Sequence, residues 1–200
     1  MSRILSLIFG LAFSTLLVAQ TYPNRPVRII VPWPPGQATD IAARMLAQRL
    51  QETLGQPFVI DNRPGAGGAL GTEIAVRAPA DGYTLLAASS GPVSIMPSLQ
   101  KLSYEPLKDL VAIGLITRNP YAVVAAPNFP ANNAREFIAV VRTSPDKYTF
   151  ASSGTGATAH LVAELFNSMA QIKARHIPYK GSAPAMTDVI NGQVSYTVET

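Results

Sequence analysis

Two loops of this 200-residue chain combine glycine with hydroxyl and amide side chains at points where a strand should give way to a helix. Residues 34–40 read Pro-Pro-Gly-Gln-Ala-Thr-Asp, and residues 152–156 read Ser-Ser-Gly-Thr-Gly. The first backbone N–H groups of a helix have no partner within the helix, and the helix dipole adds positive charge there. Such junctions bind small anions, and the hydroxyl-rich second loop fits a small carboxylate.

We expect the ligand-binding residues to lie in these two loops and in two further loops that follow strands. The candidates in the first half of the chain are Trp33, Pro35, Gly36, Gln37, Ala38, Thr39, Asp40, Ser89 and Ser90. The candidates in the second half are Ser152, Ser153, Gly154, Thr155, Gly156, Thr158, Tyr179, Lys180 and Gly181. For Trp33, the only tryptophan, two roles stand side by side: stacking on a ligand and packing at a hinge.

The second loop has two other interpretations. Residues 154–159 match Gly-x-Gly-x-x-Ala, a weak dinucleotide-binding pattern. A dinucleotide site also needs an acidic residue about 20 positions further on, where this chain has Lys173, Arg175 and His176. Nucleotide binding is therefore disfavoured. In the other interpretation the glycines only permit a tight turn.

The sequence predicts no catalytic residue, no metal and no cofactor. The absence of cysteine excludes disulfides, thiolate nucleophiles and Cys-ligated metals. The two histidines, His160 and His176, lack metal-type spacing, and no Gly-x-Ser-x-Gly motif occurs. The alternative function is a secreted α/β enzyme that uses the glycine loops for a nucleotide or ester substrate. Its candidates for proton transfer are Asp40, His160 and Asp188.

Composition indicates an exported globular protein. Hydrophobic residues make up 48% of the chain, and the net charge of +4 comes from scattered basic residues, so no nucleic-acid partner is expected. Residues 1–19 have the form of a signal peptide, with Arg3 followed by an apolar run over residues 4–18. That run is shorter than the roughly 20 residues that cross a bilayer. We expect cleavage after Ala19, with an uncleaved anchor as the alternative.

Apolar patterns in the first half predict alternating strands and helices, and hence an α/β fold with a parallel sheet. Strands are expected at residues 27–31, 57–60 and 83–88, and helices at residues 41–54, 69–78 and 92–99. Thr39 or Asp40 should cap the first of these helices. Its inward stripe is predicted to consist of Ile41, Met45, Leu46, Leu50 and Leu54.

The second half repeats this pattern. Strands at residues 111–117 and 121–126 should flank a crossover, which gives lobe 1 residues 20–117 and lobe 2 residues 118–200. Further strands are expected at residues 148–151, 174–178 and 194–198, and helices at residues 134–143, 157–169 and 184–191. Asn132 or Asn133 should cap the first of these helices, and the second should bury Leu161, Leu165 and Met169. Because the sequence stops on a strand, we expect a truncated chain whose second lobe and return segment are incomplete.

Six ordered motifs resemble the periplasmic solute receptors of tripartite tricarboxylate transporters, the Bug family. They lie at residues 22–32, 34–40, 62–68, 80–85, 151–156 and 178–185. The resemblance implies an α/β, two-lobed periplasmic binding protein, class II-like, with a parallel or mixed sheet flanked by helices in each lobe.

The same resemblance implies a periplasmic monomer that binds a small carboxylate between its lobes, largely through backbone N–H groups. Its partners would be that ligand and the membrane components of a tripartite transporter. Family members are longer, which agrees with the expected truncation. The family usually has Gly-Gly where this chain has Gly36-Gln37, and the extra side chain affects which ligand fits.

Overall fold

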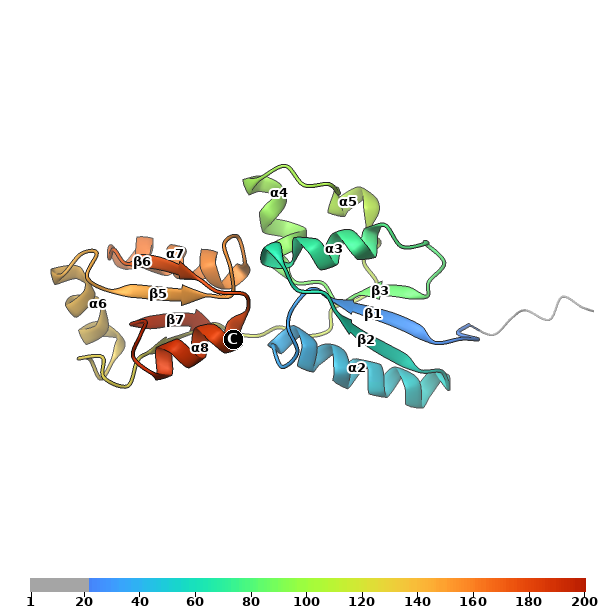
Figure 1. Ribbon diagram of the computed structural model, residues 1–200, viewed down its shortest axis with the longest axis horizontal. Helices are drawn as coiled ribbons and strands as arrows, with labels where there is room; N and C mark the ends of the chain where they lie inside the picture. Colours follow the sequence, from blue (N-terminus) through green and yellow to red (C-terminus); the bar gives the residue numbers. More distant parts are fainter. Residues whose placement is uncertain (1–21) are drawn as a thin grey trace, which may run out of the picture.

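The computed structural model describes residues 22–200, which form two α/β lobes joined by an extended segment (Figure 1). Lobe 1 denotes residues 22–109, the linker residues 110–121, and lobe 2 residues 122–200. The predicted signal peptide lies outside the described residues, and the boundary expected between residues 117 and 118 stays a prediction. No helix in residues 22–200 is both long enough and apolar enough to cross a membrane.

Lobe 1 is built on the parallel sheet that the sequence predicts. Its strands are β1 (Val27–Val31), β2 (Phe58–Asn62) and β3 (Thr84–Leu86), in the order β2-β1-β3. The crossover helices are α2 (Ala38–Leu54) and α3 (Ala69–Val76), the latter preceded by the short turn η1 (Ala66–Gly68). The two crossovers run in opposite directions across β1, so right-handed connections put α2 and α3 on opposite faces (Figure 1).

The inward stripe predicted for α2 is wrong at three of its five residues, since Ile41, Met45 and Leu54 are exposed, while Leu50 packs partly buried against the lobe 1 core. Met45 is 67% exposed and Ile41 is also exposed, whereas Ala43 and Ala47 are buried against β1. The expected caps are wrong as well, because the N-cap is Gln37, which makes no side-chain cap bond, and Asp40 lies in the first turn. A crossover helix must approach its sheet closely, so small alanines face inward and the larger apolar side chains are displaced to the flanks.

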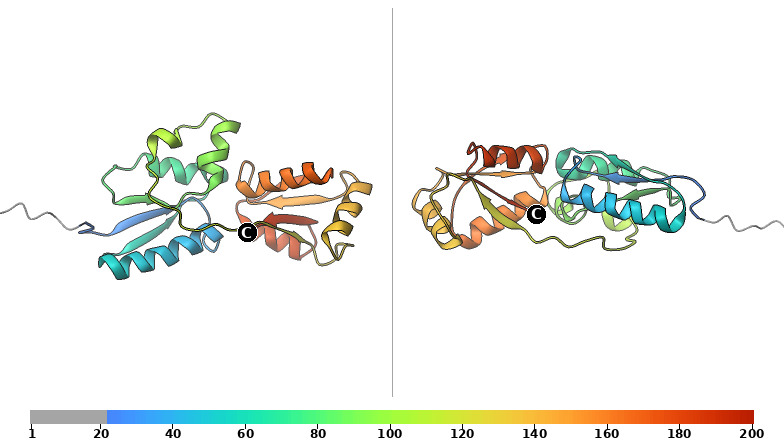
Figure 2. Two further views of the ribbon diagram at one scale, coloured as in Figure 1. Left: turned by 180° about the vertical axis from the view of Figure 1, so that it is seen from behind. Right: turned by 90° about the horizontal axis from the view of Figure 1, so that it is seen from below.

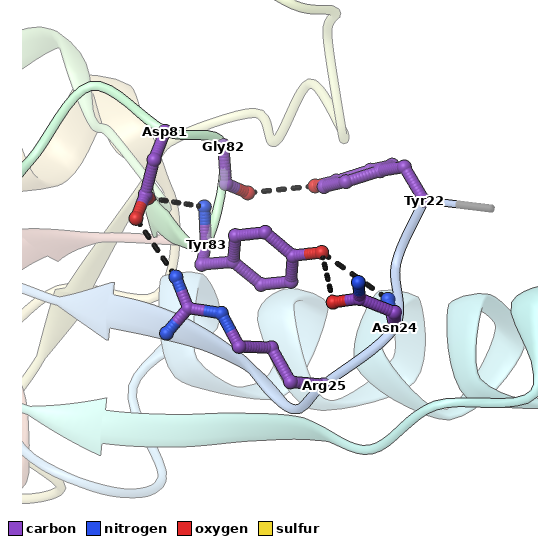
Figure 3. Close-up of polar contacts among 6 residues, drawn as sticks. All are labelled: Tyr22, Asn24, Arg25, Asp81, Gly82 and Tyr83. Carbon is purple, nitrogen blue, oxygen red and sulfur yellow. Dashed lines mark hydrogen bonds and ion pairs between the residues drawn. The ribbon is translucent and has the colours of Figure 1, made fainter. Parts of the chain in front are cut away.

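The amino-terminal end of lobe 1 is tied to the turn before β3 (Figure 3). Tyr22 donates from its hydroxyl to the Gly82 carbonyl at 2.6 Å, and Arg25 pairs with Asp81 at 2.8 Å while lying over the Tyr83 ring. This cluster fixes the start of β1 at the edge opposite the carboxyl ends of the strands.

After β3 the chain forms η2 (Gly91–Ile95), α4 (Met96–Leu99) and α5 (Pro106–Asp109), and then the linker. The strand predicted at residues 111–117 is wrong, because no strand is present there and Val111 is 89% exposed. An apolar, β-branched run becomes a strand only beside a partner with free backbone groups, and none pairs with it in residues 22–200. Figure 2 shows the linker running separately from both sheets.

Lobe 2 has a mixed sheet in the order β4-β7-β5-β6. Strand β4 (Ala122–Ala125) is antiparallel to β7 (Tyr196–Glu199), and β5 (Thr149–Ser152) is parallel to both β7 and β6 (Arg175–Pro178). Helices α6 (Ala134–Thr143) and α7 (Thr158–Ala170) contribute to a core around Phe150 and Tyr196, while α8 (Ser182–Ile190) packs with Ala151 in a separate cluster. The predicted architecture, a parallel first sheet and a second sheet flanked by helices, is confirmed.

Helices α6 and α7 give opposite results for the predicted patterns. Asn133 caps α6 by accepting from the Glu136 N–H at 3.0 Å, and Phe137 is buried, as expected. The α7 stripe is wrong, since Met169 is 77% exposed and the buried residues are Ala159, Ala163, Asn167 and Ala170. This is the same displacement of large side chains by small ones that occurs in α2.

Replacing Ala47 with leucine should lower the free energy of unfolding by about 1–3 kcal/mol, because the added atoms have no room between α2 and β1. The matched control is Met45→Ala on the exposed side of α2, which should change it by less than about 0.5 kcal/mol. Urea unfolding followed by circular dichroism measures both. A larger effect for Met45→Ala would restore the stripe predicted from the sequence.

Candidate functional site

The loops at the carboxyl ends of the strands meet between the two lobes. The Gln37 side chain of lobe 1 donates from Nε2 to Ser182 Oγ of lobe 2 at 2.6 Å. The Ser90 and Thr158 hydroxyls, also from opposite lobes, are 2.9 Å apart. Ala157 of lobe 2 is buried within the core cluster of lobe 1. The strand ends of α/β sheets are where ligands usually bind, so this interface is the candidate site.

The first loop is shaped by a buried carboxylate. Asp40 is 2% exposed and accepts from the Gly36 N–H at 2.9 Å, from Arg44 Nε at 2.9 Å and from Asn62 Nδ2 at 2.8 Å. Burial raises the pKa of Asp40, but the hydrogen bonds from Arg44, Gly36 and Asn62 outweigh it and hold the pKa below its usual value. Asp40 therefore accepts hydrogen bonds from its loop, from α2 and from β2, and it holds the turn in place.

Other candidates from lobe 1 lie closer to lobe 2. Trp33 is buried and donates from Nε1 to Ser89 Oγ at 2.9 Å, so it packs under the end of β3. Gln37 and Ser90 contact lobe 2 directly. Of the remaining candidates, Ala38 and Thr39 are partly exposed, and Pro35 and Gly36 are exposed.

Two backbone N–H groups of the second loop donate to side chains of lobe 2. Gly154 N–H donates to Ser152 Oγ at 3.2 Å, and Gly156 N–H donates to His160 Nδ1 at 3.3 Å. Ser152 Oγ also lies 2.7 Å from His176 Nε2. The loop is thus held in its turn by polar side chains behind it, and Ser153 is buried within it while Thr155 is exposed.

The stacked pair that the two histidines form behind this loop was not predicted from the sequence. Their rings are stacked with centroids 4.0 Å apart, and Phe150 stacks on His176 at 4.8 Å. Burial, and then the neighbouring His160, lower the pKa of His176 to about 4. Burial also lowers the pKa of His160, whose Nδ1 accepts from Gly156 and so carries no proton. The strands predicted at residues 148–151 and 174–178 were the available signal, because their parallel pairing brings His176 beside Phe150.

The residues of the third loop, 179–181, make contacts with different parts of the protein. Tyr179 donates to Asp188 Oδ2 at 2.6 Å, and burial followed by that carboxylate raises the pKa of Tyr179 to about 12. Lys180 is exposed. Gly181 approaches lobe 1 so closely that a Cβ there would lie 2.8 Å from Pro34 Cγ. Ser182, which was not among the site residues predicted from the sequence, makes the polar contact with Gln37 described above.

A separate hollow of about 620 Å³ lies between α2 and β2 on lobe 1, lined by Arg44, Gln48 and Phe58 among others. It is a poor candidate for the site because it is open to solvent and contains none of the loop amides. Arg44, its one basic group, is paired with Asp40. No cluster of three or more potential metal ligands occurs in residues 22–200.

Comparison with known families identifies the chain. The family model described as "Tripartite tricarboxylate transporter family receptor" matches residues 42–200 of the chain. The chain belongs to this family. The family resemblance seen in the six motifs is therefore confirmed.

Individual relatives agree with this assignment. Protein BugT of Bordetella pertussis is 40% identical over 209 residues, which cover 100% of this chain and 63% of BugT. The Rhodopseudomonas palustris protein Rpa4515, solved with adipate, is 34% identical with a TM-score of 0.85 over 89% of this chain and 60% of its own. MatC from the same organism, with bound malate, is 32% identical with a TM-score of 0.82 and corresponding shares of 89% and 61%. The chain thus spans about three fifths of the length of each of these three relatives.

Lowering the pH should destabilise the protein through His176. Its pKa is about 4 in the folded protein and near 6.5 when unfolded, so the unfolded chain takes up the proton first. The contribution is complete above pH 6.5 and is lost as the pH falls toward 4. Between pH 7 and pH 4, urea denaturation should show a loss about 1–3 kcal/mol larger in the wild type than in His176→Asn.

The groups that face His176 in this comparison are His160 on α7 and, beyond it, Glu164 at 3.8 Å from His160 Nε2. Both remain in the variant, so the difference between the two proteins isolates His176. Parallel pH dependences would contradict the assignment of the lowered pKa to this side chain.

Proposed function

We propose that this chain is the solute-binding part of a receptor that captures a small carboxylate between its lobes and delivers it to a tripartite tricarboxylate transporter. The observation that carries the proposal is the meeting of the Gln37, Ser90, Thr158 and Ser182 side chains across the lobe interface. Each of these residues lies at or beside the start of a helix, so their hydroxyls and amides converge with backbone N–H groups on one region.

The electrostatics of this region favour an anion. Helices α2, α7 and α8 all begin at the interface, and each helix dipole contributes about 0.3–1 kcal/mol toward a negative charge near its first turn. The one buried carboxylate of the first loop, Asp40, is balanced by Arg44. Glu199 is a second buried carboxyl at the end of β7, and burial raises its pKa, which favours its uncharged form. A ligand carboxylate would therefore meet donors and partial positive charge from both lobes.

Ligand entry requires the lobes to part. The Gln37–Ser182 and Ser90–Thr158 contacts join the lobes directly, and a ligand must replace them with its own hydrogen bonds. Hinged closure around a ligand is the usual motion of two-lobed receptors, and the extended linker is the segment where such a hinge would act. The bound adipate and malate of the two R. palustris relatives support a carboxylate as the ligand.

The enzymatic alternative loses support because its three proton-transfer candidates already form hydrogen bonds within the protein. Asp40 accepts hydrogen bonds from Gly36 in its loop, from Arg44 in α2 and from Asn62 in β2, while His160 accepts from Gly156 and Asp188 accepts from Tyr179. A general acid or base needs a free lone pair or proton directed at the substrate. We therefore propose a non-enzymatic receptor, exported to the periplasm with cleavage after residue 19 and acting as a monomer.

Replacing Thr158 with valine should weaken carboxylate binding about tenfold to a hundredfold, because a hydrogen bond to a charged group contributes about 1.5–3 kcal/mol. Thr187→Val is the matched control, since Thr187 is exposed on α8 and donates only to the Ala183 carbonyl. Isothermal titration calorimetry with malate and adipate measures the affinities. The proposal would be overturned if a nucleotide panel raised the melting temperature while no carboxylate bound.

A further inference from the structure

The two histidines of the chain form one stack behind the second loop, residues 152–156. His160 lies in the first turn of α7, and His176 lies on β6. Their ring centroids are 4.0 Å apart, and the ring of Phe150 on β5 is 4.8 Å from His176 and 6.3 Å from His160. Two positive charges at such a separation repel each other strongly, so the stack favours neutral rings.

Each histidine bonds to a different residue of the loop. His160 Nδ1 accepts from the Gly156 N–H at 3.3 Å. His176 Nε2 lies 2.7 Å from Ser152 Oγ, which in turn accepts from the Gly154 N–H at 3.2 Å. Gly154 and Gly156 both have positive φ, +136° and +78°, so they make the turn itself. The histidine pair therefore holds both turn-forming glycines, one directly and one through the serine.

Protonation of His160 removes part of this support. A ring nitrogen accepts a hydrogen bond only without its proton, so a proton on Nδ1 would face the Gly156 N–H and take away its acceptor. Gly156 is buried, and native proteins rarely leave a buried N–H without a partner. Ala157, the N-cap of α7, makes no side-chain cap bond that could compensate. The turn before α7 is therefore weaker when His160 is charged.

The groups around the pair keep it neutral near pH 7. Burial lowers the pKa of His160, and Glu164 on α7, with Oε1 at 3.8 Å from His160 Nε2, opposes that change. Burial and then His160 lower the pKa of His176 to about 4. From β5 the pair meets the uncharged Phe150, and from β7, beyond that ring, Tyr196, whose pKa is raised by burial so that its phenol stays neutral. Glu164 is thus the one charge that favours a proton on the pair.

We propose that His160 and His176 are positioning residues that make ligand capture depend on pH. The neutral pair holds the second loop in its binding shape, and a proton on His160 releases the loop and weakens carboxylate binding. This rests on the proposed function, because it assumes that the second loop binds the ligand. In this role neither histidine contacts the ligand. A positive charge behind the loop would by itself attract an anion, so the sign of the pH effect tells support of the loop apart from simple attraction.

The test uses two substitutions of His160. His160→Asn keeps an acceptor that cannot titrate, because asparagine Oδ1 is attached to Cγ as histidine Nδ1 is, whereas His160→Leu has no acceptor. Calorimetry with malate between pH 7.5 and pH 4.5 measures the affinities. The affinity of the wild type should fall about fivefold to tenfold more than that of His160→Asn, since a proton that must leave before binding costs up to about tenfold per pH unit.

At pH 7.5 His160→Leu should bind malate about fivefold more weakly than His160→Asn, which restores the acceptor. The carboxyl groups of malate titrate identically in every experiment, so they cancel when proteins are compared at one pH. Circular dichroism at both pH values establishes that each protein is folded.

A milder variant tests the same coupling if the His160 variants do not fold. Glu164→Gln removes the charge that favours a proton on His160, so the midpoint of the acid loss of affinity should move to a pH lower by about 0.2–0.7. Glu52→Gln on α2 is the matched control, because the Glu52 side chain is 47% exposed and that of Glu164 is 49% exposed. It should leave the midpoint unchanged.

The outcomes separate the histidine pair from the proposed function. If malate binds the wild type and His160→Asn with parallel pH dependences, or if acid strengthens binding to the wild type alone, the role of the pair is wrong and the receptor function stands. If neither malate nor adipate binds at pH 7.5, the receptor function fails, and the role of the pair with it. In NMR spectra the Gly156 amide signal should shift with the titration of His160; an amide that stays unchanged would also overturn the role of the pair.

Discussion

The constraint on which the site depends is that a strand must turn into a helix within a few residues without leaving buried backbone groups unpaired. Both lobes meet it with a polar side chain behind the turn. In lobe 1 the Asp40 carboxylate accepts the Gly36 N–H, and in lobe 2 Ser152 and His160 accept the N–H groups of Gly154 and Gly156. These internal bonds fix the loop shapes before any ligand arrives, which reduces the conformational entropy lost on binding.

The two solutions differ in charge. Lobe 1 uses an ionised carboxylate that Arg44 balances, whereas lobe 2 uses a serine and two stacked histidines whose burial keeps them neutral. A protonated His160 would direct an N–H at the Gly156 N–H and lose that bond. The order of the second loop is thus coupled to the neutrality of the histidine pair, while the first loop is insulated from pH by the lowered pKa of Asp40.

The sequence predicted the positions of strands β1 to β7 and the family because these depend largely on local signals. Apolar β-branched runs at β1, the Asn133 cap of α6 and the glycine-rich turns carry their structure within a few residues. The faces of α2 and α7 were mispredicted because close packing on a sheet favoured Ala43, Ala47 and Ala163 over longer side chains. The segment at residues 111–117 has strand-forming residues but no strand beside it to pair with.

Contacts between the lobes were the part of the site that the sequence did not predict. Gln37 and Thr158 stood out through their motifs, but Ser182 acquires its significance only from the tertiary arrangement that brings α8 to the start of α2.

Those contacts also set the terms on which a ligand binds. Gln37–Ser182 and Ser90–Thr158 already satisfy part of the interface, so a ligand gains only the difference between its own bonds and those it replaces.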